Sequence, residues 1–405
     1  MRLCKVMFAF ALFGLAVPMK AASKFPTVLA ACSAFGANGG FVIATASVDS
    51  LSLSVTSAFG KDQRLTVPLR YQPEQWQLDR PTLRWHLYDC SLFFDHSGDL
   101  LAVGITTTEY TRPQKLQIAV ADLKTSMWLS NFGVEAEQNF GLSARLRLAG
   151  FLSDTKSIVV TNALKASVKT QQRESISAIV FDASGKKLSV QPFVHSQRTL
   201  MTFYPDAANN RLWLFHCGTV SARPSQQPFC PISITNLVGD ESFSATFDPS
   251  HYTKKRTDLW MRPGTFVAPD LNTLLIAESV DGNDTVWRVD VQSQVLDRLV
   301  LPQHHFLKYD AMRGGTLSPD ADVFAVLLGQ YKIAFPYIVD NYVYEGDDIV
   351  VLQVKPLRVL GIVPHRGAKY TQGLSVDHRN GKATVLVYRQ DHWERRDFDD
   401  AQAWK

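Results

Sequence analysis

A short phrase recurs six times along this chain, and it constrains the fold more than any other feature. Each copy begins with apolar residues, passes through a turn of Pro, Asp, Ser, Gly or Asn, and continues into a run of strand-forming residues. The six copies span residues 93–103, 150–160, 203–215, 266–277, 316–326 and 374–387. Their turn residues are Ser97, Asp154, Asp206, Asp270, Asp320 and Asp377, at intervals of 50 to 64 residues. A repeat of this length indicates that one structural unit builds most of the chain.

Each unit has the pattern of a small antiparallel sheet. In four units a second pair of alternating apolar segments follows, at residues 115–130, 177–190, 285–301 and 349–363. Such alternation with short polar turns is typical of β-hairpins, so each unit is expected to hold four strands. Repeats of this size made of strands and turns are the blades of a β-propeller. Residues 41–69 have the same strand-turn-strand pattern without the signature turn, and counting them brings the expected number of blades to seven.

We therefore predict an all-β chain that folds as a single seven-bladed β-propeller of four-stranded antiparallel blades over residues 33–400. The pattern resembles the WD40-like and YVTN-type propeller superfamily, which is found in many exported bacterial proteins. The chain contains neither the Gly-His and Trp-Asp dipeptides of WD repeats nor an intact Tyr-Val-Thr-Asn string. The resemblance implies a disc with a central channel, used as a binding scaffold or as an enzyme.

The N-terminus predicts export from the cytoplasm. Arg2 and Lys5 precede an apolar stretch at residues 6–17, and small residues follow it. This order is typical of a secretory signal peptide, which we assign to residues 1–22. An alternative is a bacterial lipobox that ends at Cys32, in which case this residue would carry a lipid. No later apolar run has the length of a membrane span, so a secreted or periplasmic protein is expected.

The charge balance argues against nucleic acid as a partner. The chain holds 42 Lys and Arg residues and 38 Asp and Glu residues. Loss of Arg2, Lys5 and Lys20 with the signal peptide would leave 39 basic residues, so the mature chain is nearly neutral. Nucleic-acid binding normally requires a basic surface. The expected partner is a protein, a peptide or an anionic ligand, and the protein is expected to be a monomer.

Four cysteines follow the signal peptide: Cys32, Cys90, Cys217 and Cys230. An even number in an exported chain favours disulfide bonds. Cys217 ends one expected strand and Cys230 begins the next, so a bridge would close the loop between them. Two buried free thiols are the alternative for this pair. Cys32 with Cys90 then follows by elimination, unless Cys32 is lipidated.

A basic residue recurs seven to nine positions before the turn residue in several units. The set comprises Arg145, Arg147, Arg198, Arg262, Arg313 and Lys369. In a propeller this position lies where the innermost strand begins, at the mouth of the central channel. Converging cations there would attract a carboxylate or a phosphate. The alternative is that these residues brace neighbouring blades at an exposed rim.

Residues 335–348 form a Tyr-rich insertion between two expected strands. The insertion carries Tyr337, Tyr342 and Tyr344. Tyr supplies contact area at small entropic cost, and a loop on a rigid scaffold is a common place for recognition. We predict a partner-binding loop here; the alternative is a loop folded onto the propeller for its own stability.

Histidines and acidic residues offer further candidates. A metal site could draw on His304, His305, His365 and His378, with Asp310 or Asp377. Solvated loop histidines are the favoured interpretation. Residues 281–284 have oxygen ligands at calcium-like spacing but lack the EF-hand glycine and closing acid, so a hairpin turn is predicted. The acid pairs at 347–348 and 399–400 are expected to solvate loops.

None of the common sequence-local catalytic signatures is present. The chain has no Gly-x-Ser-x-Gly elbow, no His-Glu-x-x-His, no phosphate loop and no dinucleotide glycine fingerprint. Our first hypothesis is a binding scaffold without a cofactor. The second, which the resemblance implies, is a metal-dependent lactonase or hydrolase with Ca²⁺ or another divalent metal ion in the central channel. Its candidate residues are Asp89, His365 and Asp310, with Arg313 polarising an anionic substrate. A quinone-cofactor dehydrogenase is a third hypothesis, disfavoured because the repeated tryptophan-docking pattern is absent.

Overall fold

The computed structural model describes residues 28–36, 40–55, 63–78, 87–107, 114–136, 143–153, 156–165, 175–194, 202–215, 230–237, 242–247, 264–267, 273–280, 283–290, 296–301, 308–333, 342–365, 371–389 and 392–400. The expected signal peptide at residues 1–22 lies outside these ranges. The described chain is almost entirely β-structure, with one turn of α-helix, α1 (Gln75–Leu78), and one 3-10 turn, η2 (Ala207–Asn209). The all-β prediction is confirmed. In the described ranges no helix is long and apolar enough to cross a membrane.

The described strands form seven antiparallel sheets, in which each strand pairs with the next along the chain. Sheet 1 holds β1 (Ala30–Phe35), β2 (Phe41–Ala46), β3 (Ser50–Val55) and β4 (Gln63–Pro68); sheet 2 holds β5 (Tyr88–Phe94), β6 (Leu100–Thr107), β7 (Lys115–Asp122) and β8 (Met127–Glu135); sheet 3 holds β9 (Ser143–Phe151), β10 (Ile158–Lys165), β11 (Ser175–Phe181) and β12 (Lys187–Val194). Sheet 4 holds β13 (Thr202–Asp206), β14 (Arg211–Phe215), β15 (Cys230–Asn236) and β16 (Ser242–Phe247); sheet 5 holds β17 (Gly264–Val267), β18 (Thr273–Val280), β19 (Asn283–Asp290) and β20 (Leu296–Val300). Sheet 6 holds β21 (Lys308–Leu317), β22 (Val323–Ile333), β23 (Tyr342–Gln353) and β24 (Arg358–Val363); sheet 7 holds β25 (Thr371–Arg379), β26 (Lys382–Arg389) and β27 (His392–Asp399). Sheet 7 thus has three strands within the described ranges, where four were predicted.

Each of the six repeated phrases forms the hairpin that joins the first two strands of a sheet. In sheet 2, the Asp95 carboxylate accepts hydrogen bonds from the Leu100 N–H at 2.9 Å and from the Ser97 hydroxyl at 2.6 Å. In sheet 6, the Ser318 hydroxyl accepts one from the Val323 N–H at 3.0 Å. Short Asp and Ser side chains bind their own turns in this way, which explains the polar centre of the phrase. The predicted repeat is therefore a structural unit.

The core lies between neighbouring sheets, as strand β6 illustrates. On one face Leu101, Val103 and Ile105 pack with sheet 1, and on the other Leu100 and Ala102 pack with sheet 3. All five are at most 4% exposed. Because successive strand residues point to opposite faces and both faces are covered, the strand has a nearly continuous apolar sequence. Full burial of each Leu, Ile or Val side chain contributes roughly 1.5–3 kcal/mol.

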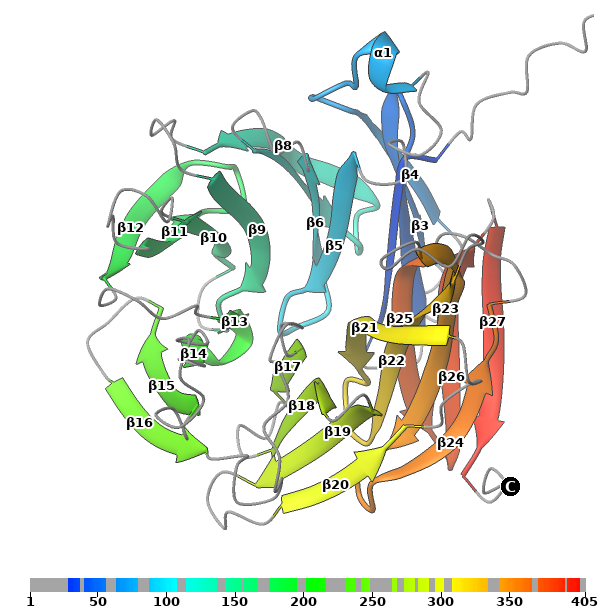
Figure 1. Ribbon diagram of the computed structural model, residues 1–405. Helices are drawn as coiled ribbons and strands as arrows, with labels where there is room; N and C mark the ends of the chain where they lie inside the picture. The colour runs from blue at the N-terminus through cyan, green and yellow to red at the C-terminus, as the bar shows by residue number, and fades with distance from the viewer. Residues whose placement is uncertain are drawn as a thin grey trace, which may run out of the picture.

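The sheets follow one another around a central axis, as Figure 1 shows. The first strand of each sheet contacts the first strand of the next, in the order β1, β5, β9, β13, β17, β21 and β25. β25 also lies beside β1, so the last sheet meets the first. There the Ala31 N–H donates to Gln372 Oε1 at 3.0 Å, and the Ser33 hydroxyl donates to the Gly373 carbonyl at 2.5 Å. We call these four residues the β1–β25 clasp. Antiparallel sheets arranged in this way form a β-propeller.

Strand β1 departs from the prediction. It begins at Ala30, before the expected boundary at residue 33, and supplies sheet 1 with a first strand that was not expected from the sequence. Cys32 in this strand is bonded to Cys90 in β5, so the pairing that the cysteine count left open is the one present in the structure. A sulfur atom in a disulfide cannot also carry a lipid, and the lipidated Cys32 is incompatible with this bond. Cys217 lies outside the described residues, so its pairing with Cys230 stays a prediction.

The Tyr-rich insertion contributes to a strand instead of forming one long loop. β22 and β23, with 11 and 12 residues, are the longest strands in the described part of the chain. Tyr342 pairs with Ile333, and Tyr344 pairs with Tyr331. Alternating aromatic and β-branched residues favour such pairing, and they extend the hairpin of sheet 6. Tyr337 lies outside the described residues.

Candidate functional site

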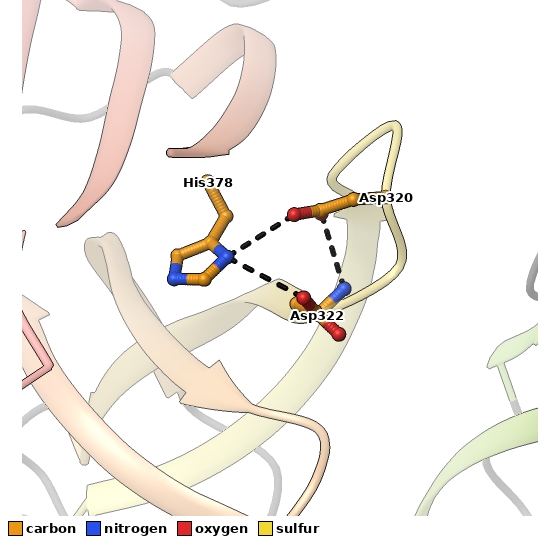
Figure 2. A group of neighbouring side chains, drawn as sticks. All are labelled: Asp320, Asp322 and His378. Atoms are coloured by element: carbon orange, nitrogen blue, oxygen red, sulfur yellow. Dashed lines mark hydrogen bonds and ion pairs between the residues drawn. The ribbon is translucent and has the colours of Figure 1, made fainter. Parts of the chain in front are cut away.

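Three side chains with metal-ligand chemistry meet where sheet 6 adjoins sheet 7 (Figure 2). His378 lies near the end of β25, and Asp320 and Asp322 lie in the turn between β21 and β22. Both segments are copies of the repeated phrase, so the fold brings two signature turns together. One possible ligand atom of each residue lies within 4.8 Å of those of the other two. We call these three residues the His378 cluster.

Carboxylates face both ring nitrogens of His378. Nδ1 lies 3.1 Å from Asp320 Oδ2 and 3.7 Å from Asp322 Oδ2, and Nε2 lies 2.8 Å from Asp400 Oδ2. Asp400 directly follows β27 in sheet 7. The His378 side chain is 14% exposed, whereas those of Asp320 and Asp322 are 39% and 54% exposed. The imidazole is therefore shielded, while the two carboxylates beside Nδ1 are open to solvent.

Hydrogen bonds fix the carboxylates around the ring. Asp320 Oδ1 accepts from the Ser318 hydroxyl at 2.5 Å and from the Asp322 N–H at 3.2 Å, which leaves Oδ2 for His378. Asp400 Oδ1 is buried and has no hydrogen-bond partner. This group thus has more carboxylate oxygens than proton donors.

The electrostatics favour a positive charge at this point. Burial lowers the pKa of His378, but hydrogen bonds to Asp400 and Asp320 raise it, and the net result is a pKa above the ordinary value. Chemically, the carboxylates can hold a proton on the imidazole or a cation beside Nδ1. Imidazole together with carboxylates is a ligand set for divalent transition metals.

The prediction of solvated loop histidines is wrong for the two described members of the set. The side chains of His378 and His365 are 14% and 19% exposed. Asp377, one of the two acids considered as ligands beside these histidines, binds Arg379 at 2.8 Å. Residue 378 lies in a strand at the contact between sheets, where the carboxylates of a neighbouring turn replace water. His304 and His305 lie outside the described residues.

A second polar group holds the connection between β24 and β25. The Asp348 carboxylate accepts from the His365 N–H at 2.8 Å and lies 2.7 Å from His365 Nδ1. Arg389, which is 1% exposed, donates to the carbonyls of Asp347 at 2.6 Å and Pro364 at 2.9 Å. Asp347 and Asp348 are 2% and 3% exposed, so the prediction that they solvate a loop is wrong. Their role in the fold is to anchor this connection.

The candidates for a metal site in the channel lie in β5, in β21 and just after β24. Asp89 is exposed in β5 of sheet 2, whereas His365 follows β24 of sheet 6. Asp310 lies in β21 opposite Gln330, and Arg313 lies at a bulge of the same strand. A channel metal stays a prediction.

The predicted anion-binding residues lie partly in the described chain. Arg145 and Arg147 are in β9, and Arg313 is in β21; these are first strands of sheets 3 and 6. Arg147 is exposed. Arg198, Arg262 and Lys369 lie outside the described residues. Convergence of these cations at a channel mouth therefore stays a prediction.

A row of tyrosines crosses sheet 6. The register places Tyr309 in β21 opposite Tyr331 in β22, and Tyr331 opposite Tyr344 in β23. We call these three residues the tyrosine row. Sequence reasoning missed Tyr309 and Tyr331. Residues 335–348 were expected to form a loop, and a loop has no strand register from which pairing partners could be inferred. The period-two spacing of Tyr342 and Tyr344 was the available signal for a strand.

Comparison with known proteins finds similarity only among solved structures. No protein family and no curated protein matches this chain. The propeller of Dos1 is 13% identical, with 92% of this chain and 84% of that chain covered and a TM-score of 0.42. The periplasmic gluconolactonase PpgL of Pseudomonas aeruginosa is also 13% identical, with 87% and 93% covered and a TM-score of 0.42. The β-propeller domain of the Trilobed protease from Pyrococcus furiosus is 9% identical, with 91% and 94% covered and a TM-score of 0.45. All three are propellers, and similarity at this level carries no argument about function.

Proposed function

We propose that the protein is a closed seven-bladed propeller that acts outside the cytoplasm as a binding scaffold for a protein or peptide. The succession of first-strand contacts and the β1–β25 clasp support closure of the ring. The Cys32–Cys90 bridge supports an oxidising compartment. The observation that carries the binding role is the tyrosine row, which crosses from β21 onto the hairpin of β22 and β23.

In the described part of the chain, this hairpin is longer than its counterparts. Within those ranges the second and third strands of the other six sheets have at most eight residues, against 11 and 12 in β22 and β23. At about 3.4 Å per residue, three further residues add about 10 Å to a strand. We therefore expect this hairpin to reach beyond the neighbouring sheets and to be the first part of that end to meet a partner.

The residue types on the hairpin suit recognition of a polypeptide. Positions paired across antiparallel strands share one face of the sheet, and so do residues two apart in a strand. The register thus gives the tyrosine row and Tyr342 equivalent positions across the sheet. Tyr offers a large apolar ring and a hydroxyl at low cost in side-chain entropy, and aromatic residues are enriched at protein interfaces. A small anionic ligand would not need such an area.

Buried polar side chains in the rest of the ring join the sheets into a rigid platform. The Gln117 side chain, from a fully buried residue in sheet 2, donates to the Pro68 carbonyl of sheet 1 at 3.0 Å and accepts from the Arg70 N–H at 2.8 Å. Arg389 of sheet 7 binds two carbonyls of sheet 6 in the same manner. A platform held in this way presents its hairpin in one orientation, which reduces the entropy lost on binding.

Site-specific photo-crosslinking in the producing cell tests this proposal. A photoreactive phenylalanine analogue would replace Tyr344, and in a second variant Tyr342. The matched control carries the analogue at Leu188 of β12, which is 52% exposed on the outer edge of sheet 3. We expect a discrete crosslinked product from the hairpin positions and none from the control.

Two measurements make the outcome decisive. Each variant must melt within about 2 °C of the wild type, which shows that the propeller is intact. The partner found by crosslinking should then bind the purified wild type and lose at least about tenfold affinity on Tyr342→Ala/Tyr344→Ala substitution, as expected for interface aromatic residues. Equal crosslinking from Leu188, or unchanged affinity of the double variant, would refute this placement.

A further inference from the structure

We propose that the His378 cluster binds a divalent transition-metal ion, for which Zn²⁺ is the natural probe. The ion would be held by His378 Nδ1, Asp320 Oδ2 and Asp322 Oδ2, with solvent in the remaining position. This site differs from the central-channel metal considered for the enzyme hypothesis, because it lies where the signature turns of sheets 6 and 7 meet (Figure 2).

The distances around Nδ1 suit a shared ion. In a tetrahedral zinc site with bonds of about 2.0–2.1 Å, neighbouring ligand atoms are about 3.3 Å apart. Asp320 Oδ2 and Asp322 Oδ2 lie 3.1 and 3.7 Å from Nδ1, on either side of that separation. The distance to Asp322 exceeds a hydrogen bond, so a proton on Nδ1 leaves this carboxylate unengaged. An ion between the three atoms would engage all of them.

The opposite side of the imidazole is already arranged as in metal sites. A metal-bound histidine commonly donates its other ring N–H to a carboxylate, which fixes the tautomer. Here Nε2 lies 2.8 Å from Asp400 Oδ2, an ordinary hydrogen-bond distance. With that proton on Nε2, the lone pair of Nδ1 is directed towards Asp320 and Asp322. Asp400 is therefore a positioning residue and not a ligand.

Charge and ligand type together indicate the class of ion. Three carboxylates surround one imidazole, and the buried Asp400 Oδ1 has no hydrogen-bond partner. This excess of negative charge favours a cation. Ca²⁺ and Mg²⁺ prefer sites made of oxygen ligands alone, whereas an imidazole with carboxylates suits Zn²⁺ and its first-row neighbours. Binding would displace any proton on Nδ1 into solvent, because only the neutral nitrogen can coordinate.

The ion would cross-link two sheets of the propeller. Asp320 and Asp322 belong to sheet 6, and His378 belongs to sheet 7. A metal ion that binds only the folded protein raises its melting temperature with ion concentration. We therefore expect Zn²⁺ to stabilise the contact between sheets 6 and 7.

Calorimetric titration of the full chain with ZnCl₂, after chelator treatment and without a polyhistidine tag, tests the proposal. We expect one equivalent to bind and a proton to be released, seen as a dependence of the heat on buffer ionisation. His378→Gln should abolish this binding, and Asp322→Asn should weaken it at least about tenfold. Asp400→Asn should weaken it by about 10- to 100-fold, because the carboxylate charge that raises the basicity of the imidazole is lost.

The controls separate coordination from effects on folding. His392 belongs to β27 in the same sheet, and its side chain is 58% exposed, so His392→Gln should leave the affinity unchanged. Asp322 is exposed, so in chelator the Asp322→Asn variant should have the same melting temperature as the wild type. The proposal is overturned if the wild type binds no stoichiometric Zn²⁺, which would leave His378 as a protonated bridge between carboxylates. It is also overturned if His378→Gln binds Zn²⁺ as tightly as the wild type does.

Discussion

Removal of the Cys32–Cys90 bridge should destabilise the propeller substantially. The bond joins β1 to β5, which are the first strands of sheets 1 and 2, across 58 residues of sequence. The other side of β1 is held by the β1–β25 clasp. Substitution Cys32→Ala/Cys90→Ala would therefore free one side of β1.

The size of the effect follows from the loop that the bridge closes. Cross-linking a loop of this length removes about 14 cal/mol/K of entropy from the unfolded chain, or about 4 kcal/mol at 25 °C. The unfolding entropy of about 2.1 cal/mol/K per residue amounts to about 0.8 kcal/mol/K for this chain. The expected loss in melting temperature is thus about 5 °C.

Urea unfolding of the oxidised wild type and of the double variant measures the loss in the free energy of unfolding. A matched control is Cys90→Ala beside the wild type, both in reductant, because this pair differs in packing but not in cross-linking. The control should show less than about 1 kcal/mol difference, since Cys and Ala differ by one atom of side chain. If the oxidised wild type and the double variant differ by less than about 1 kcal/mol, the entropic reasoning fails for this bond.

Three further outcomes are expected. In metal-free protein the pKa of His378 is raised, so the charged imidazole stabilises the folded protein. This stabilisation is fully present below the ordinary histidine pKa of 6.5 and is lost as the pH rises through the folded-state pKa. The difference in melting temperature between the wild type and His378→Gln should accordingly shrink as the pH is raised above 6.5; a difference that grows would contradict this sign. Gly104→Ala would place a Cβ 2.8 Å from Leu148 Cβ across the contact of sheets 2 and 3, and should cost about 1–3 kcal/mol in urea unfolding. An unchanged midpoint there would show that the sheets can separate slightly. Arg389→Leu would leave two carbonyls without their donor, and a loss of about 2–4 kcal/mol is expected; a loss below about 0.5 kcal/mol would mean that water replaces the guanidinium.

The repeated phrase predicted the local structure well, because its causes are local. A polar turn residue such as Ser97 binds its own hairpin, and the runs that flank it are apolar because both faces of the strand are covered. These features appear in sequence order and need no knowledge of distant contacts. β1 was not predicted, because the segment after it lacks the Pro, Asp and Ser residues of the repeated turn. Gly36 and Gly40 were the available signal for a turn between β1 and β2.

The candidate sites were less predictable, because their members come from different units of the repeat. His378 was identified as a possible ligand, but its partners Asp320 and Asp322 belong to the turn of the preceding sheet, 58 and 56 positions earlier. Nothing local in the sequence distinguishes these acids from ordinary turn residues. The tyrosine row depended likewise on strand register, which the spacing of residues along the chain does not reveal.

By itself, then, the sequence determined the repeat unit, its hairpins and its all-β class, because turn chemistry and alternating burial act over a few residues. Only the tertiary structure decided which turns face one another, that β1 lies between a disulfide on one side and a clasp on the other, and that an acid pair expected in solvent is buried. Those outcomes depend on the packing of one sheet against the next. That packing brings together residues about 55 to 340 positions apart, and the free energy of such contacts depends on burial and geometry that exist only once the sheets are packed together.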